Sequence, residues 1–184
     1  MKKVFFIVAL TAASFAGFAQ SEKEASKPLS FSVGVEAALP IGDFGDAYKF
    51  GIGGSVQADY KVAPELAITL NAGYISFSGK SVTTTYVIPT TPPQTISQTF
   101  KNATIGYVPV LAGVKYWFSD LYASGQLGLT FATGNGASGS TFTYAPGIGY
   151  KFAPIDVLVK YVGYAAQNGG SASSNIGIRV AYNF

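Results

Sequence analysis

Large apolar side chains alternate with small or polar ones along most of the chain. In the last nine residues every second position carries a large apolar side chain: Ile176, Ile178, Val180, Tyr182 and Phe184. Because successive side chains of a β-strand point to opposite faces, such a stretch predicts a strand with one apolar and one polar face. The same alternation predicts eight strands in all, over residues 29–39, 51–60, 66–77, 103–118, 121–131, 140–152, 156–164 and 176–184.

The lengths of the strands and of their connections indicate how the strands are arranged. Most strands have about ten residues, the length that crosses a bilayer at the tilt of a barrel strand. The connections after the second, fourth and sixth strands are short and the others are longer, as in outer-membrane barrels with periplasmic turns and extracellular loops. We therefore predict an all-β fold, an eight-stranded antiparallel up-and-down transmembrane β-barrel, over residues 29–184. A soluble exported β-sandwich is the alternative, because its strands also alternate.

The first residues predict export from the cytoplasm. Lys2 and Lys3 precede an uncharged, mostly apolar run, and small residues follow this run. The run is too short for a spanning helix and is typical of a secretory signal peptide, cleaved here after Ala19. We expect residues 1–19 to be the signal peptide, residues 20–28 to form a short periplasmic tail, and the barrel to lie in the bacterial cell outer membrane.

The longest predicted connection, residues 78–102, has a pattern of its own. It is rich in Thr and Pro, yet apolar and polar residues still alternate over 82–87 and 95–100. This pattern predicts a hairpin that continues the third and fourth strands above the membrane, with its tip at residues 89–93. Because an exposed strand edge can pair with another chain, we expect this hairpin to bind an extracellular partner by strand addition.

Aromatic residues near the strand ends predict two girdles at the level of the lipid headgroups. The girdle beside the short turns would consist of Tyr60, Tyr116, Phe118, Tyr150, Phe152, Tyr182 and Phe184. The girdle toward the long loops would consist of Tyr74, Tyr107, Phe131, Phe142, Tyr144 and Tyr164.

Charged residues on the polar faces of the strands predict a network inside the barrel. They are Glu36, Asp59, Lys115, Lys151, Asp156, Lys160 and Arg179. The lumen of an eight-stranded barrel is wide enough for its own side chains. These charges must therefore pair or meet water, since removing one partner of a buried pair costs about 3–5 kcal/mol. Glu36 and Arg179 lie on the two strands that close the barrel. The network is either a structural plug of ion pairs, which the narrow lumen favours, or a gated ion path in which the pairs exchange.

Two stretches, Val-Pro-Val-Leu-Ala-Gly-Val-Lys-Tyr-Trp-Phe at 108–118 and Leu-Tyr-Ala-Ser-Gly-Gln-Leu-Gly-Leu at 121–129, resemble a known family. They are similar to the eight-stranded outer-membrane β-barrels of Bacteroidota type, a family that includes the OmpA-like transmembrane barrel. The final strand also resembles the last strand of these barrels. The resemblance implies that Ile178, Val180, Tyr182 and Phe184 form a C-terminal signal that the barrel assembly machinery recognises during insertion.

The composition excludes several kinds of chemistry. The chain has no His and no Cys, which excludes Ser–His–Asp and Cys–His nucleophilic catalysis and zinc sites with the usual nitrogen and sulfur ligands. Barrel enzymes of the family that this chain resembles depend on a catalytic His. We therefore expect no enzymatic activity, no cofactor and no metal. The Gly-rich sequence at 134–139 matches a dinucleotide-binding pattern, but a strand follows it instead of a helix, so we interpret it as a loop.

The charge argues against nucleic acid as a partner. The formal net charge of +3 falls to +1 once Lys2 and Lys3 leave with the signal peptide, and no basic cluster remains. Three hypotheses about function stay open. The first is a structural or surface-interaction protein that acts through its extracellular loops, chiefly residues 78–102. The second is a narrow porin-like channel for ions or small solutes. The third is a helper of secretion or envelope assembly with a periplasmic protein partner.

Overall fold

A computed structural model describes residues 28–89, 94–134, 139–166 and 172–184 of the chain. The predicted signal peptide, nearly all of the predicted tail, the hairpin tip at 90–93 and most of the Gly-rich sequence lie outside the described residues. Among the described residues, no helix has the length and apolar content needed to cross a membrane.

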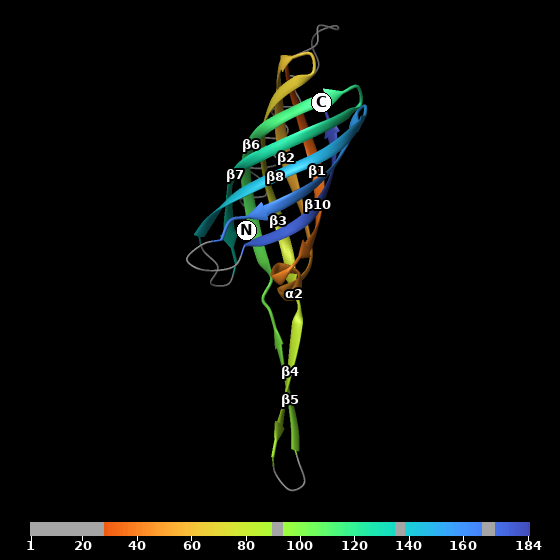
Figure 1. Cartoon of the computed structure of the whole chain (residues 1–184). Coiled ribbons are helices and arrows are strands. Elements are labelled where there is room, and N and C mark those ends of the chain that lie inside the picture. The colour runs from red at the N-terminus through yellow and green to blue at the C-terminus, as the bar shows by residue number, and fades with distance from the viewer. Residues whose placement is uncertain (1–27, 90–93, 135–138, 167–171) are drawn as a thin grey trace, which may run out of the picture.

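Within the described part of the chain, eight antiparallel strands close into a barrel (Figure 1). They are β1 (Leu29–Ile41), β2 (Tyr48–Ala63), β3 (Leu66–Gly79), β6 (Ile105–Phe118), β7 (Leu121–Thr133), β8 (Gly139–Phe152), β9 (Ile155–Tyr164) and β10 (Ser173–Asn183). Each strand pairs with the next barrel strand along the chain, and β10 pairs with β1, Glu36 lying opposite Arg179. The predicted barrel is confirmed, and the strand ends differ from the prediction by a few residues.

The remaining elements lie at one end of the barrel. Strands β4 (Ser81–Ile88) and β5 (Gln94–Lys101) form the predicted hairpin between β3 and β6, and the short helix α2 (Asp43–Ala47) connects β1 to β2. Figure 1 shows the hairpin extending away from the barrel beside α2, with the C-terminus at the opposite end. The alternation pattern predicts a connection between residues 39 and 51 and no helix there, so α2 is a difference from the prediction.

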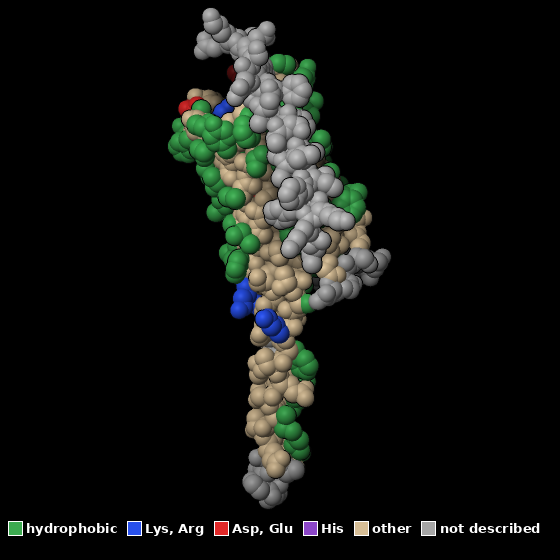
Figure 2. Space-filling model, turned by 180° about the vertical axis from the view of Figure 1, so that it is seen from behind, with side chains coloured by type: hydrophobic (Ala, Val, Ile, Leu, Met, Phe, Trp, Pro, Cys, Tyr) green, Lys and Arg blue, Asp and Glu red, His purple; other side chains and the backbone are tan. Residues whose placement is uncertain are grey.

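The side chains of the barrel have the reverse of the usual distribution in a soluble protein. On β1, Val35 is 66% exposed on the outside, whereas the neighbouring Glu36 is 3% exposed on the inside. The same alternation runs along the other barrel strands, and Figure 2 shows apolar side chains along the flanks of the barrel. In water such a surface would be unfavourable, but in a bilayer it faces hydrocarbon.

A tight turn connects β6 and β7 at the end of the barrel opposite the hairpin. Ser119 and Asp120 join the two strands, and Ser119 adopts a φ of 79°. This left-handed conformation is uncommon for a residue other than glycine. It allows Phe118 and Leu121 to pair directly across the turn. The predicted two-residue turn is therefore present at this position.

Candidate functional site

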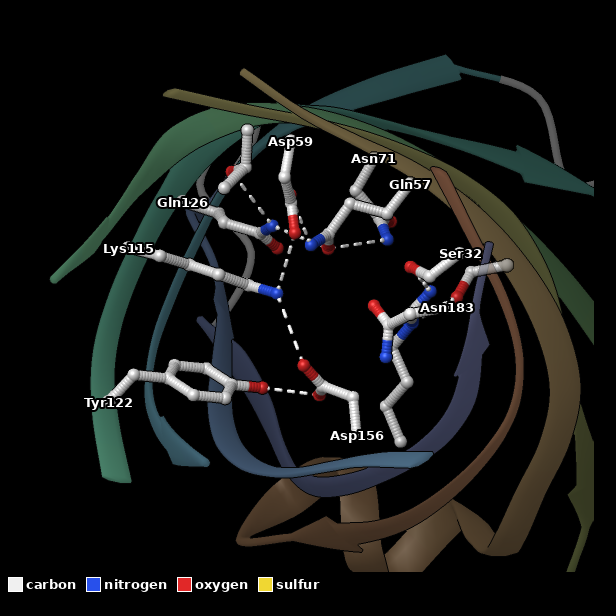
Figure 3. A network of polar contacts seen from close by, with 12 residues as sticks. Ser32, Gln57, Asp59, Asn71, Lys115, Tyr122, Gln126, Asp156 and Asn183 are labelled. Carbon is white, nitrogen blue, oxygen red and sulfur yellow. Dashed lines mark hydrogen bonds and ion pairs between the residues drawn. The ribbon is translucent and has the colours of Figure 1, made fainter. Parts of the chain in front are cut away.

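Among the residues that the structure describes, six charged side chains are buried inside the barrel. We call Glu36, Asp59, Lys115, Asp156, Lys160 and Arg179 the lumen charges; each is at most 6% exposed. Lys115 on β6 reaches across the lumen, where its Nζ lies 2.9 Å from Asp59 Oδ2 on β2 and 3.4 Å from Asp156 Oδ2 on β9 (Figure 3). The Tyr122 hydroxyl donates a hydrogen bond to Asp156, and Lys115 lies over the Tyr122 ring at 4.7 Å from its centroid.

Glu36 organises the second half of the lumen charges. Lys160 Nζ lies 2.7 Å from Glu36 Oε2, and Arg179 Nε lies 3.8 Å from Glu36 Oε1. Arg179 also donates hydrogen bonds to the hydroxyls of Ser55 (2.8 Å) and Ser32 (2.9 Å). The lumen charges thus comprise three carboxylates and three cations, so their formal charges cancel inside the barrel.

Buried amide side chains extend this network. Gln57 Nε2 donates to Asp59 Oδ1 at 2.7 Å, and the Gln57 carbonyl oxygen accepts hydrogen bonds from Asn71 (3.3 Å) and Gln126 (3.2 Å). Alternation places these residues on the inner face, but it does not show that they are partners of the charges. Their polar character at inward positions was the signal that could have found them.

Lys151 differs from the lumen charges. It is half-buried near the end of β8 and makes no ion pair with the described part of the chain. Position 151 lies one residue before the last of β8, beside the turn to β9, and therefore at the rim of the barrel. The structure brings together the other six predicted charges and leaves Lys151 outside their network.

Aromatic side chains fill the lumen at the end that carries the hairpin. We call Phe44, Phe77, Tyr107 and Tyr164 the aromatic plug. The centroid of the Phe44 ring, on α2, lies 5.0 Å from that of Phe77 on β3 and 5.9 Å from that of Tyr107 on β6. The ring centroids of Tyr107 and Tyr164, which is on β9, lie 5.1 Å apart. Because these rings come from α2 and from opposite walls of the barrel, the aromatic plug spans its cross-section.

The aromatic plug corrects one prediction and adds a residue. Tyr107 and Tyr164, predicted to lie in the outer girdle, face inward instead. On β6 the outward positions are even-numbered, such as Val110, and on β9 they are odd-numbered, such as Val159. Strand parity therefore assigns both tyrosines to the lumen. Phe44 was not predicted, since a single aromatic residue in a loop produces no periodic signal.

The base of the hairpin is fastened to the loop that carries Phe44. The Lys80 backbone N–H donates a hydrogen bond to the carbonyl oxygen of Ala47 at 2.8 Å, and the side-chain amide of Asn102 donates to the same oxygen at 3.1 Å. The Lys80 ammonium also donates to the Gly45 carbonyl oxygen. These contacts hold the hairpin base and α2 together.

Beyond this base the hairpin is exposed. β4 and β5 pair with each other from Ser81–Lys101 to Ile88–Gln94 and, in the described residues, with no other strand. β5 is exposed along its whole length. Both outer edges of the hairpin therefore present unpaired backbone donors and acceptors.

Comparison of the sequence with models of protein families identifies the family of this chain. Residues 9–184 match the model of the outer membrane protein beta-barrel domain. The chain belongs to this family. The strands of the closed barrel therefore span the bilayer, and the protein is located in the outer membrane. No curated protein matches the sequence.

Solved structures share the fold of this outer membrane protein beta-barrel domain. The crystal structure of Ail, the attachment invasion locus protein of Yersinia pestis, is 13% identical, covers 85% of this chain and 97% of Ail, and has a TM-score of 0.52. Ail in complex with the heparin analogue sucrose octasulfate is 12% identical, with the same coverages and a TM-score of 0.50. The N-terminal barrel domain of Pseudomonas aeruginosa OprF is 13% identical over 84% of this chain and 97% of that domain, with a TM-score of 0.48. At these identities the likeness to Ail concerns the fold alone.

The C-terminal positions lie on the outside of this family's barrel. Ile178, Val180, Tyr182 and Phe184 are all exposed, and the rings of Tyr182 and Phe184 lie 5.1 Å apart. Their role as a signal for the barrel assembly machinery stays a prediction. Within the described residues, no group of three or more His, Cys, Asp or Glu side chains is arranged to hold a metal ion.

Proposed function

We propose that this outer-membrane barrel is a non-enzymatic surface-interaction protein and that the β4–β5 hairpin is its binding element. The observation that carries the proposal is an exposed two-stranded hairpin that projects from a barrel with a filled lumen. The partner is a protein outside the cell, reached through the exposed surface of the hairpin.

The filled lumen supports an interaction role over a channel. Two layers of side chains join opposite walls: the ion pairs of Lys115 with Asp59 and Asp156, and the aromatic plug. An ion moving along the lumen would have to separate buried pairs, which costs about 3–5 kcal/mol for each partner lost, and pass between packed rings. A hydrogen bond from Gln57 holds Asp59 in place, and Arg179, a further buried cation, is held by its hydrogen bond to Ser55.

The anchoring of the hairpin supports its use as a binding element. An isolated two-stranded hairpin is at best marginally stable in water. Here the hairpin continues the register of β3 and β6, and Lys80 and Asn102 fasten its base to α2. A hairpin held in this way loses less conformational freedom when it binds, which favours affinity. Its free edges suit the pairing of an extended segment by strand addition.

The comparison with Ail is consistent with this proposal. That protein of similar fold is named for attachment and invasion, and one of its structures contains a heparin analogue. In the present chain, residues 81–100 contain no Lys and no Arg, and the one cation of the two strands, Lys101, lies at the base of the hairpin. Binding of a sulfated polyanion needs such cations. We therefore propose a protein partner for the hairpin.

Removing the hairpin tests the proposed function. Residues 82–100 are replaced by Asn-Gly, which favours a tight turn between the paired residues Ser81 and Lys101. We expect the variant to reach the outer membrane as a folded barrel, because β4 and β5 add nothing to the closed sheet. Crosslinking on intact cells, followed by identification of the attached proteins, should show the loss of the extracellular partner. An unchanged set of partners contradicts the proposal.

A further inference from the structure

The short helix α2 lies at the hairpin end of the barrel and belongs to none of its strand ladders (Figure 1). On β1 the last paired residue is Ile41, and on β2 the first is Tyr48. Residues 43–47, between these two, form α2. The helix can therefore move away from the mouth of the lumen while every pair of barrel strands stays intact.

Phe44 holds α2 on the mouth of the lumen. Its side chain is 5% exposed, although it lies on a connection between strands. Its ring lies near rings from four different barrel strands, with centroid separations of 4.9 Å to Tyr48, 5.0 Å to Phe77, 5.9 Å to Tyr107 and 6.2 Å to Tyr164. Because Phe44 contacts every other ring of the aromatic plug, its withdrawal opens the plug.

Two residues at the base of the hairpin hold the C-terminal end of α2. The Gly45 carbonyl oxygen accepts a hydrogen bond from the Lys80 ammonium, and the Ala47 carbonyl oxygen accepts from the Lys80 backbone and the Asn102 side chain. The Asn102 backbone N–H donates to the Lys80 carbonyl oxygen at 2.9 Å, which joins the two residues to each other. We call Lys80 and Asn102 the latch.

The latch lies where the hairpin joins the barrel, at a break between two strand ladders. The β3–β6 ladder ends at the pair Phe77–Ile105, and the β4–β5 ladder begins at Ser81–Lys101. The residues between them, 78–80 and 102–104, belong to neither of these ladders. A continuous ladder would resist bending, so the break is the place where the hairpin can turn relative to the barrel wall. Such a turn moves the latch.

A buried polar group lies beneath the aromatic plug. Asn175 is 1% exposed and pairs with Val162, two residues further into the barrel than Tyr164. Its side-chain amide donates a hydrogen bond to the Tyr164 hydroxyl at 3.0 Å, but its carbonyl oxygen accepts none from the described residues. A buried acceptor without a partner is unfavourable, and water can satisfy it. The closed arrangement therefore carries a cost that opening the mouth to water removes.

We infer that α2 is a lid on the mouth of the lumen and that the latch keeps this lid closed. When the latch is broken, Phe44 leaves the aromatic plug and water enters the lumen as far as Asn175. The ion pairs of Lys115 stay in place further down, so the open lid creates a water-filled vestibule and no channel. A partner that draws the hairpin aside is the trigger. The trigger rests on the proposed function, whereas the lid and the latch do not.

A single cysteine beneath the aromatic plug reports whether the lid is open. The chain contains no Cys, so Asn175→Cys introduces a unique thiol. The purified protein in lipid vesicles is treated with a small charged methanethiosulfonate, and the rate of modification follows the open fraction. We expect slow modification in the otherwise native chain. Lys80→Met and Asn102→Ala together should raise the rate about tenfold or more, because two hydrogen bonds of the latch are lost. Phe44→Ala should raise it as well.

Two controls accompany this measurement. Thr99→Ala removes the hydrogen bond between the Thr83 and Thr99 hydroxyls within the hairpin and leaves the latch intact, so the rate at position 175 should not change. Ser124→Cys reports loosening of the whole barrel, because Ser124 is 8% exposed and is paired with Lys115 deep in the lumen. Its modification should be equally slow in all variants. Equal rates at position 175 with and without the latch overturn the inference, and so does an equal rise at position 124.

The connection between lid and hairpin is tested in the opposite direction. Coupling is reciprocal, so release of the lid should also release the hairpin. Spin labels on cysteines at the exposed positions Val87 and Phe131 measure the distance between the hairpin and the barrel. Phe44→Ala should widen the distribution of this distance. Val162→Ala also removes buried side-chain volume from the lumen, on a barrel strand, and should leave the distribution narrow. An unchanged distribution in Phe44→Ala overturns the latch.

The outcomes separate this inference from the proposed function. If the latch variants open the lid but replacing residues 82–100 leaves the set of extracellular partners unchanged, the lid stands and the proposed function is wrong. If that replacement removes the partner but the rate at position 175 never changes, the proposed function stands and the lid is wrong.

Discussion

Replacing Lys115 by Met should lower the free energy of unfolding by about 3–5 kcal/mol, because it leaves Asp59 and Asp156 buried without their cation. Lys115 is 1% exposed and pairs with both carboxylates across the lumen, so water does not readily take its place. Methionine keeps a side chain of similar length, which limits the loss of packing. Urea unfolding of the barrel in lipid vesicles measures the change.

Lys151→Met is the matched control for this prediction. Lys151 is half-buried and makes no ion pair with described residues, so the same substitution should change the free energy of unfolding by about 0.5 kcal/mol or less. Adding Asp59→Asn to Lys115→Met should cost less than the sum of the two single changes, because the second substitution removes one of the unpaired charges. Equal losses from Lys115→Met and Lys151→Met contradict the structural role of the lumen charges.

Replacing Leu127 by Arg should destabilise the inserted barrel by about 2–4 kcal/mol if the site lies near the middle of the bilayer. Leu127 lies at the centre of β7 and is 56% exposed on the outer face. The substitution places a charge in hydrocarbon. The unfolding free energy in vesicles and the amount of protein in the outer-membrane fraction both report the effect. Val180 on β10 is also exposed on the outer face, and Val180→Arg should behave in the same way.

Val87→Arg is the control for the lipid-facing substitutions. Val87 is also exposed, at 64%, but it belongs to the hairpin that extends away from the barrel. The arginine there stays in water, so the stability and the insertion of the barrel should not change. Tolerance of arginine at Leu127 and Val180 would mean that lipid does not cover the outer face.

The strands could be predicted because lipid imposes a strict pattern. Where one face of a strand meets hydrocarbon and the other a narrow lumen, every second residue is constrained, as at Val35 and Glu36. The pairing of β1 with β10 followed from closure of the barrel, which brought Glu36 opposite Arg179. The hairpin was predictable for a related reason, because its two faces differ in polarity.

The contacts across the lumen could not be predicted from the same pattern. Lys115 reaches Asp59 and Asp156 on strands that are not its neighbours, and such contacts depend on the stagger of the strands around the barrel. Phe44 was missed because its position depends on how a loop folds back onto the barrel. Nearness to the strand ends predicts Tyr107 and Tyr164 on the outside, whereas the parity of their strands places them in the lumen.

Quenching of tryptophan fluorescence by brominated lipid tests most directly whether hydrocarbon covers the barrel. The chain has one tryptophan, Trp117, which faces the lumen. Its ring centroid lies 6.1 Å from that of the buried Tyr122. Leu127→Trp in a Trp117→Phe background moves the fluorophore to the outer face. We expect bromine at mid-chain to quench position 127 strongly and the native Trp117 weakly. Equal, weak quenching at both positions would contradict a lipid-covered barrel.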